Sequence, residues 1–528
     1  MNIQPFIQSG YELLHDGTEE LSRVEANGIR IDVPLLKKTK EQLKEKIREC
    51  RTGMEKHKLH SIWRKRFGHK FNLNSRDQLE HIIRKELKVS LRKKTERGNW
   101  AVDDEVLQSI DHPFVRQLEA YYRYDKTLGT FLKGIEWEIC GDRLHPSFDL
   151  HTARSFRSSS SNPNFQNFPV RNKETAIIIR SLFIASPDSV LVENDFKGIE
   201  VGVSGCYHKD KNFLRYVRDP EKNDMHRDMA KQVYCLSDSD WAKLDKSAAK
   251  DARYGAKNKF VFPQFYGDYY VACARNLWEW IEKGKLKGPD GESLFKHLEK
   301  KGITELGACD PDQKPVRGTF EFHLKEIQDD FWNNRFGEYG QWRKDFYNDY
   351  LKHGYFDLLT GFRIHGVYSR NQVTNFPVQG AAFHCLLWSL VQINRELRRR
   401  GMKSMIVGQI HDSLIADVRI DELAEYQSIV STVTQKWLRK HFDWICVPLE
   451  VEYEICPIGK PWSEKREFKF KEGQFKHPEK DIWTPNAEKF LHSLIQPAVI
   501  PDRPSAAAER GSFRSKHQVK TKLAQSKI

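Results

Sequence analysis

Two short apolar runs of strand-forming composition stand out in a chain whose texture is otherwise mostly helical. The first, Ser189-Val190-Leu191-Val192-Glu193-Asn194-Asp195, closes on a carboxylate, and the second, Met405 to Ile410, leads through His411 into Asp412. Alone, either aspartate would be interpreted as a solvent-facing turn residue. If the two strands are neighbours, however, their carboxylates meet and can hold two divalent cations ~3.5 to 4 Å apart, which suits in-line displacement at phosphorus.

Length and texture predict several lobes. The 528 residues exceed a single compact domain, because domains average roughly 150 residues. Residues 35 to 66 are dense in charge with apolar positions at helical spacing, which fits either a solvated helix face or a basic arm along a phosphate backbone. Further helices are predicted over 76 to 87, with Asn74 or Ser75 as N-cap, and over 113 to 132.

Composition narrows the class of partner. Lys plus Arg exceed Asp plus Glu by 87 − 73 = 14, so a polyanion is attracted at long range. The nine cysteines lack zinc-ligand spacing and are expected to be reduced thiols. The N-terminus has no signal or transit pattern and no apolar run of about 18 residues is evident, so we expect a cytoplasmic protein that does not contact membranes.

Along the chain, a pair of cationic residues lies between the two aspartates. Arg253 and Lys257 fall four residues apart, hence on one helix face, and the aromatic stretch 260 to 266 follows them. Two such cations can grip a triphosphate while an aromatic ring stacks on a base. The alternative is a surface cation pair beside an aromatic core.

These residues belong to a series of motifs that resembles the polymerase portion of family A DNA polymerases, the bacterial DNA polymerase I type, and phage members in particular. Seven matches occur in family order: Glu25-Ala26-Asn27-Gly28 with Asp32; His145-Pro146-Ser147-Phe148 with 157 to 169; Asp195 to Glu200; Asp224-Met225-His226; Asn375 to Gly380; His411-Asp412; and Pro448 to Val451 with Gly459 and Trp462. They span about residues 11 to 465.

The resemblance implies an α+β fold of the right-hand type, with a helical thumb, an antiparallel-sheet palm and helical fingers. We expect an N-terminal segment and thumb over 1–145, palm over 146–221 and 341–470, and fingers over 222–340 with an insertion at about 281–328. Residues 471–528 form a basic tail that we expect to be flexible and to be a candidate contact for replisome proteins.

The resemblance also implies roles. Asp195 and Asp412, with the carbonyl of Phe196, would hold two Mg²⁺ ions, for which Mn²⁺ can substitute. His226, Arg253 and Lys257 would bind the dNTP phosphates; Glu200 would block a ribose 2′-OH, Phe262 would favour deoxy over dideoxy substrates, and Tyr266 would lie beside the templating base. The expected primer–template contacts are Arg154, Arg157, Asn164, Gln166, Asn167, Asn375, Gln379 and His411.

Several positions depart from the family pattern. Lys257 and Tyr266 are nine residues apart where the family has eight, so we place an extra residue, as a π-bulge, between Lys257 and Phe262, with Lys259 as the alternative to Lys257. Lys197, Gly198 and Gly202 replace Ser, Gln and Arg, which predicts altered primer or template contacts. Ser413 replaces the family's Glu. This change removes a nearby carboxylate but leaves both proposed metal ligands, Asp195 and Asp412, in place.

The predicted activity is primer extension with dNTPs on a template. Only about 20 residues precede the Glu-Ala-x-Gly segment, so we expect no proofreading or 5′ nuclease activity. Two alternatives stay open: a single-subunit phage-type RNA polymerase, which shares the Gly-Ile and His-Asp-Ser features, and an inactive nucleic-acid-binding replisome subunit. Glu200 argues against the first and the intact aspartates and cations argue against the second.

Overall fold

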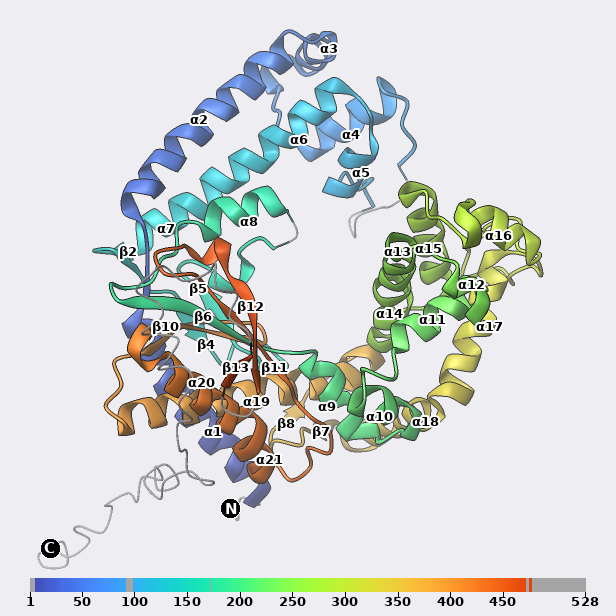
Figure 1. The fold of residues 1–528 in the computed structure, drawn as a ribbon. Helices are drawn as coiled ribbons and strands as arrows, with labels where there is room; N and C mark the ends of the chain where they lie inside the picture. The colour runs from blue at the N-terminus through green and yellow to red at the C-terminus, as the bar shows by residue number, and fades with distance from the viewer. Residues whose placement is uncertain (1–4, 92–97, 171, 472–473, 477–528) are drawn as a thin grey trace, which may run out of the picture.

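The computed structural model describes residues 5–91, 98–170, 172–471 and 474–476, and for 5–8, 105, 469–471 and 474–476 the backbone alone. Figure 1 shows a central sheet with one helical lobe, α2–α7, above it and a second, α11–α17, to its right. The predicted tail, 471–528, lies outside the described residues except for Lys471 and the short strand 474–476.

The central sheet has six antiparallel strands in the order β13-β12-β11-β6-β10-β9. Their bounds are β6 Ser189–Phe196, β9 Met405–Ile410, β10 Ser413–Arg419, β11 Val451–Ile455, β12 Arg466–Lys471 and β13 Gln474–Lys476. Both predicted strand runs are therefore confirmed, and β6 and β10 pair directly. Smaller sheets join β1 (Ile29–Arg30), β2 (Ile139–Cys140) and β3 (Arg143–Leu144), β4 (Ser147–Asp149) to β5 (Ser159–Ser161), and β7 (Tyr355–Asp357) to β8 (Arg363–His365).

Both faces of the central sheet are covered, because successive strand residues point to opposite sides. Along β6, Val190 and Val192 enter a core that contains α1 (Pro5–Asn27), α9 (Ile199–His208), α19 (Arg370–Arg399) and α20 (Leu423–Ser431), whereas Leu191 enters a second core. That second core includes Phe165 and Trp462, whose rings stack with centroids 6.0 Å apart. The sheet is thus held rigidly from both sides.

Helix α19 is the main support of the first core. Ser369 and Gln372 form a capping box at its start, and its length of 30 residues carries it across the sheet. Among the described residues it is the one helix long and apolar enough to cross a membrane, contrary to the expectation of no such run, but 89% of its most apolar segment is buried inside the fold. A buried core helix passes the same test, so this segment gives weak support for a membrane span.

The lobe that we expected to be the thumb is helical. It consists of α2 (Val33–Glu55), α3 (Lys58–Phe67), α4 (Arg76–Lys85), α5 (Asp104–Ser109), α6 (Pro113–Lys126), a π-helical turn (Thr127–Leu132) and α7 (Lys133–Glu138). The predicted helices at 76 and 113 are confirmed, with Ser75 as the N-cap of α4. Leu79, Ile82 and Ile83 form the buried face of α4, as the spacing predicts.

The opposite lobe has its own core. Its helices are α10 (Lys211–Arg218), α11 (Met225–Val233), α12 (Asp238–Ala242), α13 (Lys246–Ala256), α14 (Phe262–Tyr266), α15 (Tyr270–Gly284), α16 (Leu294–Lys300), α17 (Phe320–Asp330) and α18 (Gly337–His353). Leu294, Leu298 and Leu324, within the expected insertion, are buried in this core together with Phe213, which precedes the expected boundary at 222. The segment 281–328 is therefore an integral part of the lobe's packing.

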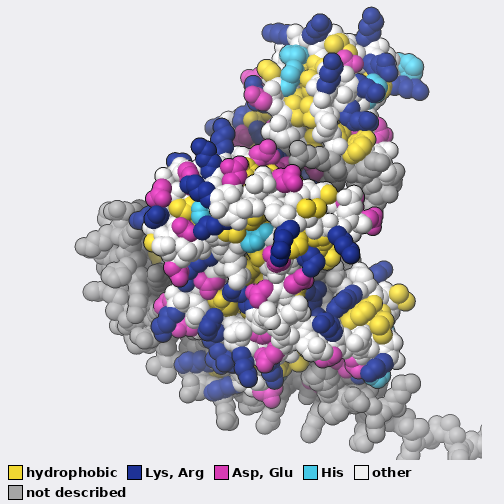
Figure 2. All heavy atoms as spheres, turned by 90° about the vertical axis from the view of Figure 1, so that its right-hand side faces the viewer, with side chains coloured by type: hydrophobic (Ala, Val, Ile, Leu, Met, Phe, Trp, Pro, Cys, Tyr) yellow, Lys and Arg dark blue, Asp and Glu magenta, His cyan; other side chains and the backbone are white. Residues whose placement is uncertain are grey.

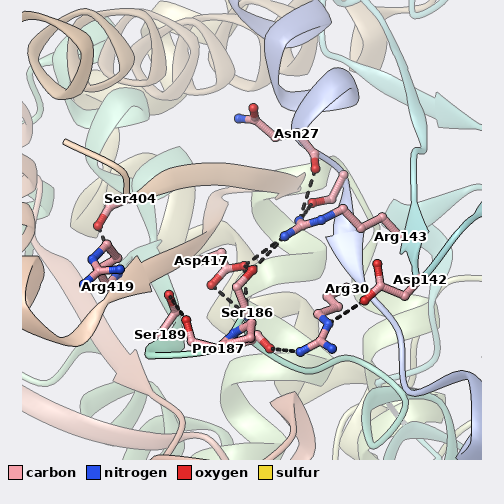
Figure 3. Close-up of polar contacts among 12 residues, drawn as sticks. Asn27, Arg30, Asp142, Arg143, Ser186, Pro187, Ser189, Ser404, Asp417 and Arg419 are labelled. Carbon is pink, nitrogen blue, oxygen red and sulfur yellow. Dashed lines mark hydrogen bonds and ion pairs between the residues drawn. The ribbon is translucent and has the colours of Figure 1, made fainter. Parts of the chain in front are cut away.

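A buried polar network fixes the end of the sheet remote from residue 412 (Figure 3). The carboxylate of Asp417, 3% exposed on β10, accepts hydrogen bonds from the backbone N–H of Ser186 at 3.1 Å and from its hydroxyl at 2.5 Å. Arg143 donates to the same hydroxyl at 2.6 Å and to the carbonyls of Asn27 and Gly28. The network joins α1, β3 and β10 and stabilises the alignment of β10 beside β6.

Candidate active site

The two aspartates that the sequence analysis singled out lie at adjacent strand ends. Asp195 of β6 pairs with Ser413 of β10, and Asp412 precedes Ser413 in the two-residue turn between β9 and β10. The Phe196 N–H donates to the carbonyl of Asp412 at 3.1 Å, which ties the end of β6 to this turn. His411 completes the turn with a positive φ of 49°, a backbone conformation that histidine adopts more readily than most residues.

The electrostatics of this pair fit a divalent metal. Burial, followed by the charges of Asp412, Glu193 and Glu452, raises the pKa of Asp195 to about 7. Burial and the charge of Glu200 raise the pKa of Asp412 to about 6, against the opposing effect of Arg157, whose Nη2 lies 3.9 Å from Asp412 Oδ1. Two partly buried carboxylates repel each other when both are ionised. A hard cation such as Mg²⁺, which prefers oxygen ligands, would offset that repulsion and stabilise the ionised forms.

Glu200, at the start of α9, connects three parts of the molecule. Its Oε1 accepts from Arg157 Nη1 at 3.2 Å, and its Oε2 accepts from the Tyr266 hydroxyl at 2.8 Å. Asn375 of α19 donates in turn to the carbonyl of Tyr266 at 3.1 Å. Glu200 is thereby held in a defined position beside Asp412.

The helix that carries the cation pair contains the predicted irregularity. After α13, residues Lys257–Val261 form a π-helical turn, and α14 begins at Phe262. This confirms the prediction of an extra residue between Lys257 and Phe262 in the form of a π-bulge. Because the turn absorbs that residue, Arg253, Lys257 and Phe262 line the same cavity, whereas Lys259 lines another between α15 and the end of α5. The structure therefore places Lys257 rather than Lys259 beside Arg253.

A cavity of about 310 Å³ collects the predicted phosphate-binding side chains of this lobe, His226, Arg253 and Lys257. Burial, and then the nearby charge of Arg253, lowers the pKa of Lys257. Burial, Arg253 and Lys257 lower the pKa of His226 to about 4, and its buried Nδ1 has no hydrogen-bond partner among the residues that the structure describes. An anion in the cavity would relieve this repulsion and offer that nitrogen a partner.

A second cavity of about 200 Å³ adjoins the first and brings six predicted site residues together. These residues are Glu200, Phe262, Tyr266, Asn375, Gln379 and Asp412. They come from four separate elements, namely α9, α14, α19 and the β9–β10 turn, and Phe262 lines both cavities. The ring of Phe262 lies edge-on to that of His226 at 5.7 Å and within 5.1 Å of Lys257 Nζ.

Gln409 is a structural residue of the site that the sequence analysis missed. It is 1% exposed; its Oε1 accepts from Ser158 Oγ and from Gln166 Nε2, both at 2.7 Å, and its Nε2 donates to the carbonyl of His411 at 2.6 Å. It therefore couples the predicted primer–template segment to the turn that carries Asp412. A polar residue two positions before His411, in an otherwise apolar strand, was the sequence signal that could have identified Gln409.

The remaining predicted contacts lie at the edge of this arrangement. Asn164 Oδ1 accepts from the Asn167 N–H at 3.1 Å and caps a 3₁₀ turn, Phe165–Asn167, while the Asn167 side chain is exposed. Arg154 is exposed as well, whereas Arg157 contacts Glu200 and Asp412. Asp224, which the sequence indicates only as the first residue of the Asp-Met-His motif, accepts from Arg253 Nε at 2.7 Å and caps α11.

Comparison with known proteins identifies the class. The family model "DNA polymerase family A" matches residues 35–257 and 345–464, nearly two thirds of the chain, so the chain belongs to this family. The unmatched stretch between these ranges, 258–344, contains the expected insertion and all of the π-helical turn except its first residue, Lys257.

Individual relatives agree with this assignment. The chain is 26% identical to DNA polymerase I of Lactococcus lactis subsp. cremoris over 404 residues, covering 76% of this chain and 40% of that protein. It is 26% identical to the thermostable DNA polymerase I of Thermus filiformis over 454 residues, covering 85% of this chain and 47% of that protein. The chain thus spans less than half the length of these relatives.

A solved structure shows the same fold. The POL domain of Pol1 from M. smegmatis, in complex with DNA primer-template and dNTP, superposes with a TM-score of 0.62 at 21% identity, covering 85% of this chain and 70% of that one. The predicted α+β right-hand fold is therefore confirmed. In keeping with the sequence-based expectation, we use the names thumb for the helical lobe at α2–α7, palm for the central sheet and fingers for the lobe around α11–α17.

Proposed function

We propose that this chain is a DNA-directed DNA polymerase that extends a primer 3′-OH with dNTPs on a template. The observation that carries the proposal is the position of the Asp195–Asp412 pair next to the cavity that contains His226, Arg253 and Lys257. Carboxylates for metal binding thus lie beside cations for a polyphosphate. Nucleotidyl transfer needs this combination, because its catalysis is mainly positioning and charge neutralisation.

Asp195 and Asp412, with the carbonyl of Phe196, would hold two Mg²⁺ ions, for which Mn²⁺ would substitute. When bound, the ions would activate the primer 3′-OH and stabilise the leaving pyrophosphate. Arg253, Lys257 and His226 would hold the triphosphate from the fingers side and orient its α-phosphorus toward the aspartates.

The adjoining cavity would receive the nucleoside. Glu200, fixed by Arg157 and Tyr266, would exclude a 2′-hydroxyl, and Phe262 would pack on the sugar or base and favour deoxy over dideoxy substrates. Tyr266 would lie beside the templating base. Asn375, Gln379, Arg157 and His411 would contact primer and template.

The thumb would bind duplex DNA through its charge. Its tip carries the exposed cations Lys56, Lys58, Arg64, Lys65, Arg66 and Lys70. Lys and Arg side chains are correspondingly prominent at the top of Figure 2, the height at which α3 lies in Figure 1. This supports the phosphate-backbone interpretation of the basic N-terminal helices.

Primer extension with a labelled primer, template, dNTPs and Mg²⁺ tests the proposal. Asp195→Ala and Asp412→Ala should each lower the rate by at least about a thousandfold, because each removes a ligand on which the positioning of both reactants depends. Asp421→Asn, an exposed aspartate paired with Arg419, is the control and should match the wild type. Substantial extension by either alanine variant would sink the proposal.

The same assay separates the alternatives. RNA polymerase activity would appear as primer-independent incorporation of NTPs, and an inactive replisome subunit would bind the primer–template without incorporating any nucleotide. Membership of DNA polymerase family A favours the DNA polymerase.

Other parts of the proposal need separate measurements. We propose that this chain does not proofread; release of a labelled mismatched 3′ nucleotide would contradict that expectation. We also propose a cytoplasmic, phage-type enzyme whose basic tail contacts replisome proteins, and the lobe boundaries given above. Deleting 477–528 should leave primer extension by the isolated chain unchanged.

A further inference from the structure

Lys197 occupies an unusual place in the palm. It lies two residues after Asp195, where the family pattern has serine, and its side chain is 59% exposed. It lines the 310 Å³ cavity together with His226, Arg253 and Lys257 of the fingers. Lys197 thus brings a cation to the palm side of the cavity that we propose for the triphosphate.

The local backbone fixes where Lys197 stands. Its N–H donates to the carbonyl of Glu450 at 2.9 Å, which continues the pairing of β6 with β11. The next residue, Gly198, has a φ of 58° and starts α9, so the chain turns sharply just after Lys197. A lysine at this turn projects from a rigid strand end, and only its side chain is free to move.

Glu452 is the ion-pair partner of Lys197. Its Oε1 lies 3.6 Å from Lys197 Nζ, and it pairs with Asp195 across β11 and β6. Both side chains of this ion pair are substantially exposed, at 59% and 42%, so the pair is weak. A polyphosphate with several negative charges would compete effectively with one carboxylate for the ammonium group.

The other carboxylates that line the cavity compete little for Lys197. Asp224 is already bonded to Arg253 Nε at 2.7 Å. Glu450 meets Lys197 through its backbone carbonyl. In the described structure, therefore, the carboxylate that pairs with Lys197 is that of Glu452.

We propose that Lys197 is a fourth phosphate-binding residue. Its ammonium group would move away from Glu452 and contact the terminal phosphates of the incoming nucleotide from the palm. The inference rests on the proposed function. Lys197 and the fingers cations would then hold the polyphosphate from opposite sides, and binding would replace the Lys197–Glu452 pair with a charge-assisted contact.

The test is the dNTP dissociation constant of the full chain bound to a primer–template with a 3′-dideoxy primer, in Mg²⁺, so that no bond is formed. Lys197→Gln should weaken dNTP binding about tenfold, the size of one charge-assisted hydrogen bond. Lys197→Arg should stay within about threefold of wild type, because it keeps the charge. Lys352→Gln, an exposed lysine on α18, controls for net charge and should have no effect.

A second measurement distinguishes phosphate binding from DNA binding. The affinity of Lys197→Gln for the primer–template alone should equal that of wild type. A dNTP affinity unchanged by Lys197→Gln, or a loss confined to primer–template affinity, would overturn the inference. Failure of the wild-type chain to extend a primer would instead refute the proposed function, so the two failures are distinguishable.

Discussion

The hydroxyl of Tyr266, in the last turn of α14, donates a hydrogen bond to the carboxylate of Glu200 on α9 at 2.8 Å. This bond joins the fingers to the palm beside Asp412. Burial and the neighbouring Glu200 charge hold the pKa of Tyr266 well above its usual range, so the tyrosine stays protonated and remains the donor. Because Arg157 grips the other oxygen of Glu200, the carboxylate has little freedom to move out of the cavity.

A fixed carboxylate beside the nucleotide cavity predicts sugar discrimination by volume. Glu200→Ala should raise ribonucleotide incorporation relative to dNTP by about tenfold or more, measured as a ratio of kcat/KM values. Glu200→Gln keeps the side-chain volume and should retain most of the discrimination. Equal discrimination by wild type and Glu200→Ala would remove Glu200 from this role.

The Asp224–Arg253 ion pair predicts a positioning role for Asp224. Asp224→Asn keeps an N-cap acceptor for α11 but loses the charge that orients Arg253, so KM for dNTP should rise several-fold with little change in stability. Asp224→Ala should raise KM equally and also lower the free energy of unfolding by about 1 kcal/mol, because the cap is lost. An unchanged KM in both variants would show that Arg253 needs no such partner.

The π-helical turn predicts an asymmetry between two single-residue deletions. Deleting Asn258, inside the turn, should convert it to regular α-helix and keep both flanking segments in phase, so dNTP KM should stay within about tenfold of wild type. Deleting Ala252, in regular helix, rotates the preceding part of α13 by about 100° and should abolish folding of the fingers or activity. Thermal melting and primer extension measure both outcomes; equal damage from the two deletions would argue against an absorbed residue.

Burial of His208 predicts loss of stability in acid. Burial lowers its pKa from 6.5 to about 3; its Nδ1 accepts from the Asp210 N–H at 3.0 Å, and its ring stacks on Tyr339 at 3.9 Å. Below pH 6.5 the unfolded chain takes up a proton that the folded chain excludes, so stability falls as pH decreases. The loss from pH 6.5 to 5 should be about 2 kcal/mol.

The variant His208→Asn supplies the comparison for this prediction. Asparagine keeps an acceptor for the Asp210 N–H but does not titrate, so its stability should fall less over the same pH range. Urea denaturation of both proteins at pH 7.5, 6.5 and 5.0 gives the difference, in which the other titrating groups cancel. Parallel pH profiles would show that His208 titrates normally.

Features set by local rules could be predicted from the sequence. The helices at 76 and 113 follow from a cap or a proline at their start and an apolar face, and the strand runs at 189 and 405 follow from their composition. The π-bulge was predicted from the resemblance to family A polymerases, because Lys257 and Tyr266 are nine residues apart where the family has eight. The packing of the surrounding segments, in contrast, decided that Lys257 rather than Lys259 faces the cavity that Arg253 lines.

Long-range relationships depended on the tertiary structure. No local sequence pattern predicts that Gln409 accepts a hydrogen bond from Gln166, 243 residues away, or that Asp224 accepts one from Arg253. Such pairs form because strand order and helix packing bring distant segments together. The packing of the expected insertion into the fingers core was likewise outside what spacing predicts.

The sequence by itself determined which residue types were available, that Asp195 lies near the end of one strand run, and that Asp412 follows shortly after the other. Only the tertiary structure decided that β6 and β10 are neighbours and that the carboxylates meet beside the cations of the fingers. The physical reason is that strand identity is encoded in residues close along the chain, whereas electrostatic repulsion and charge complementarity exist only between groups that folding has brought within a few ångströms.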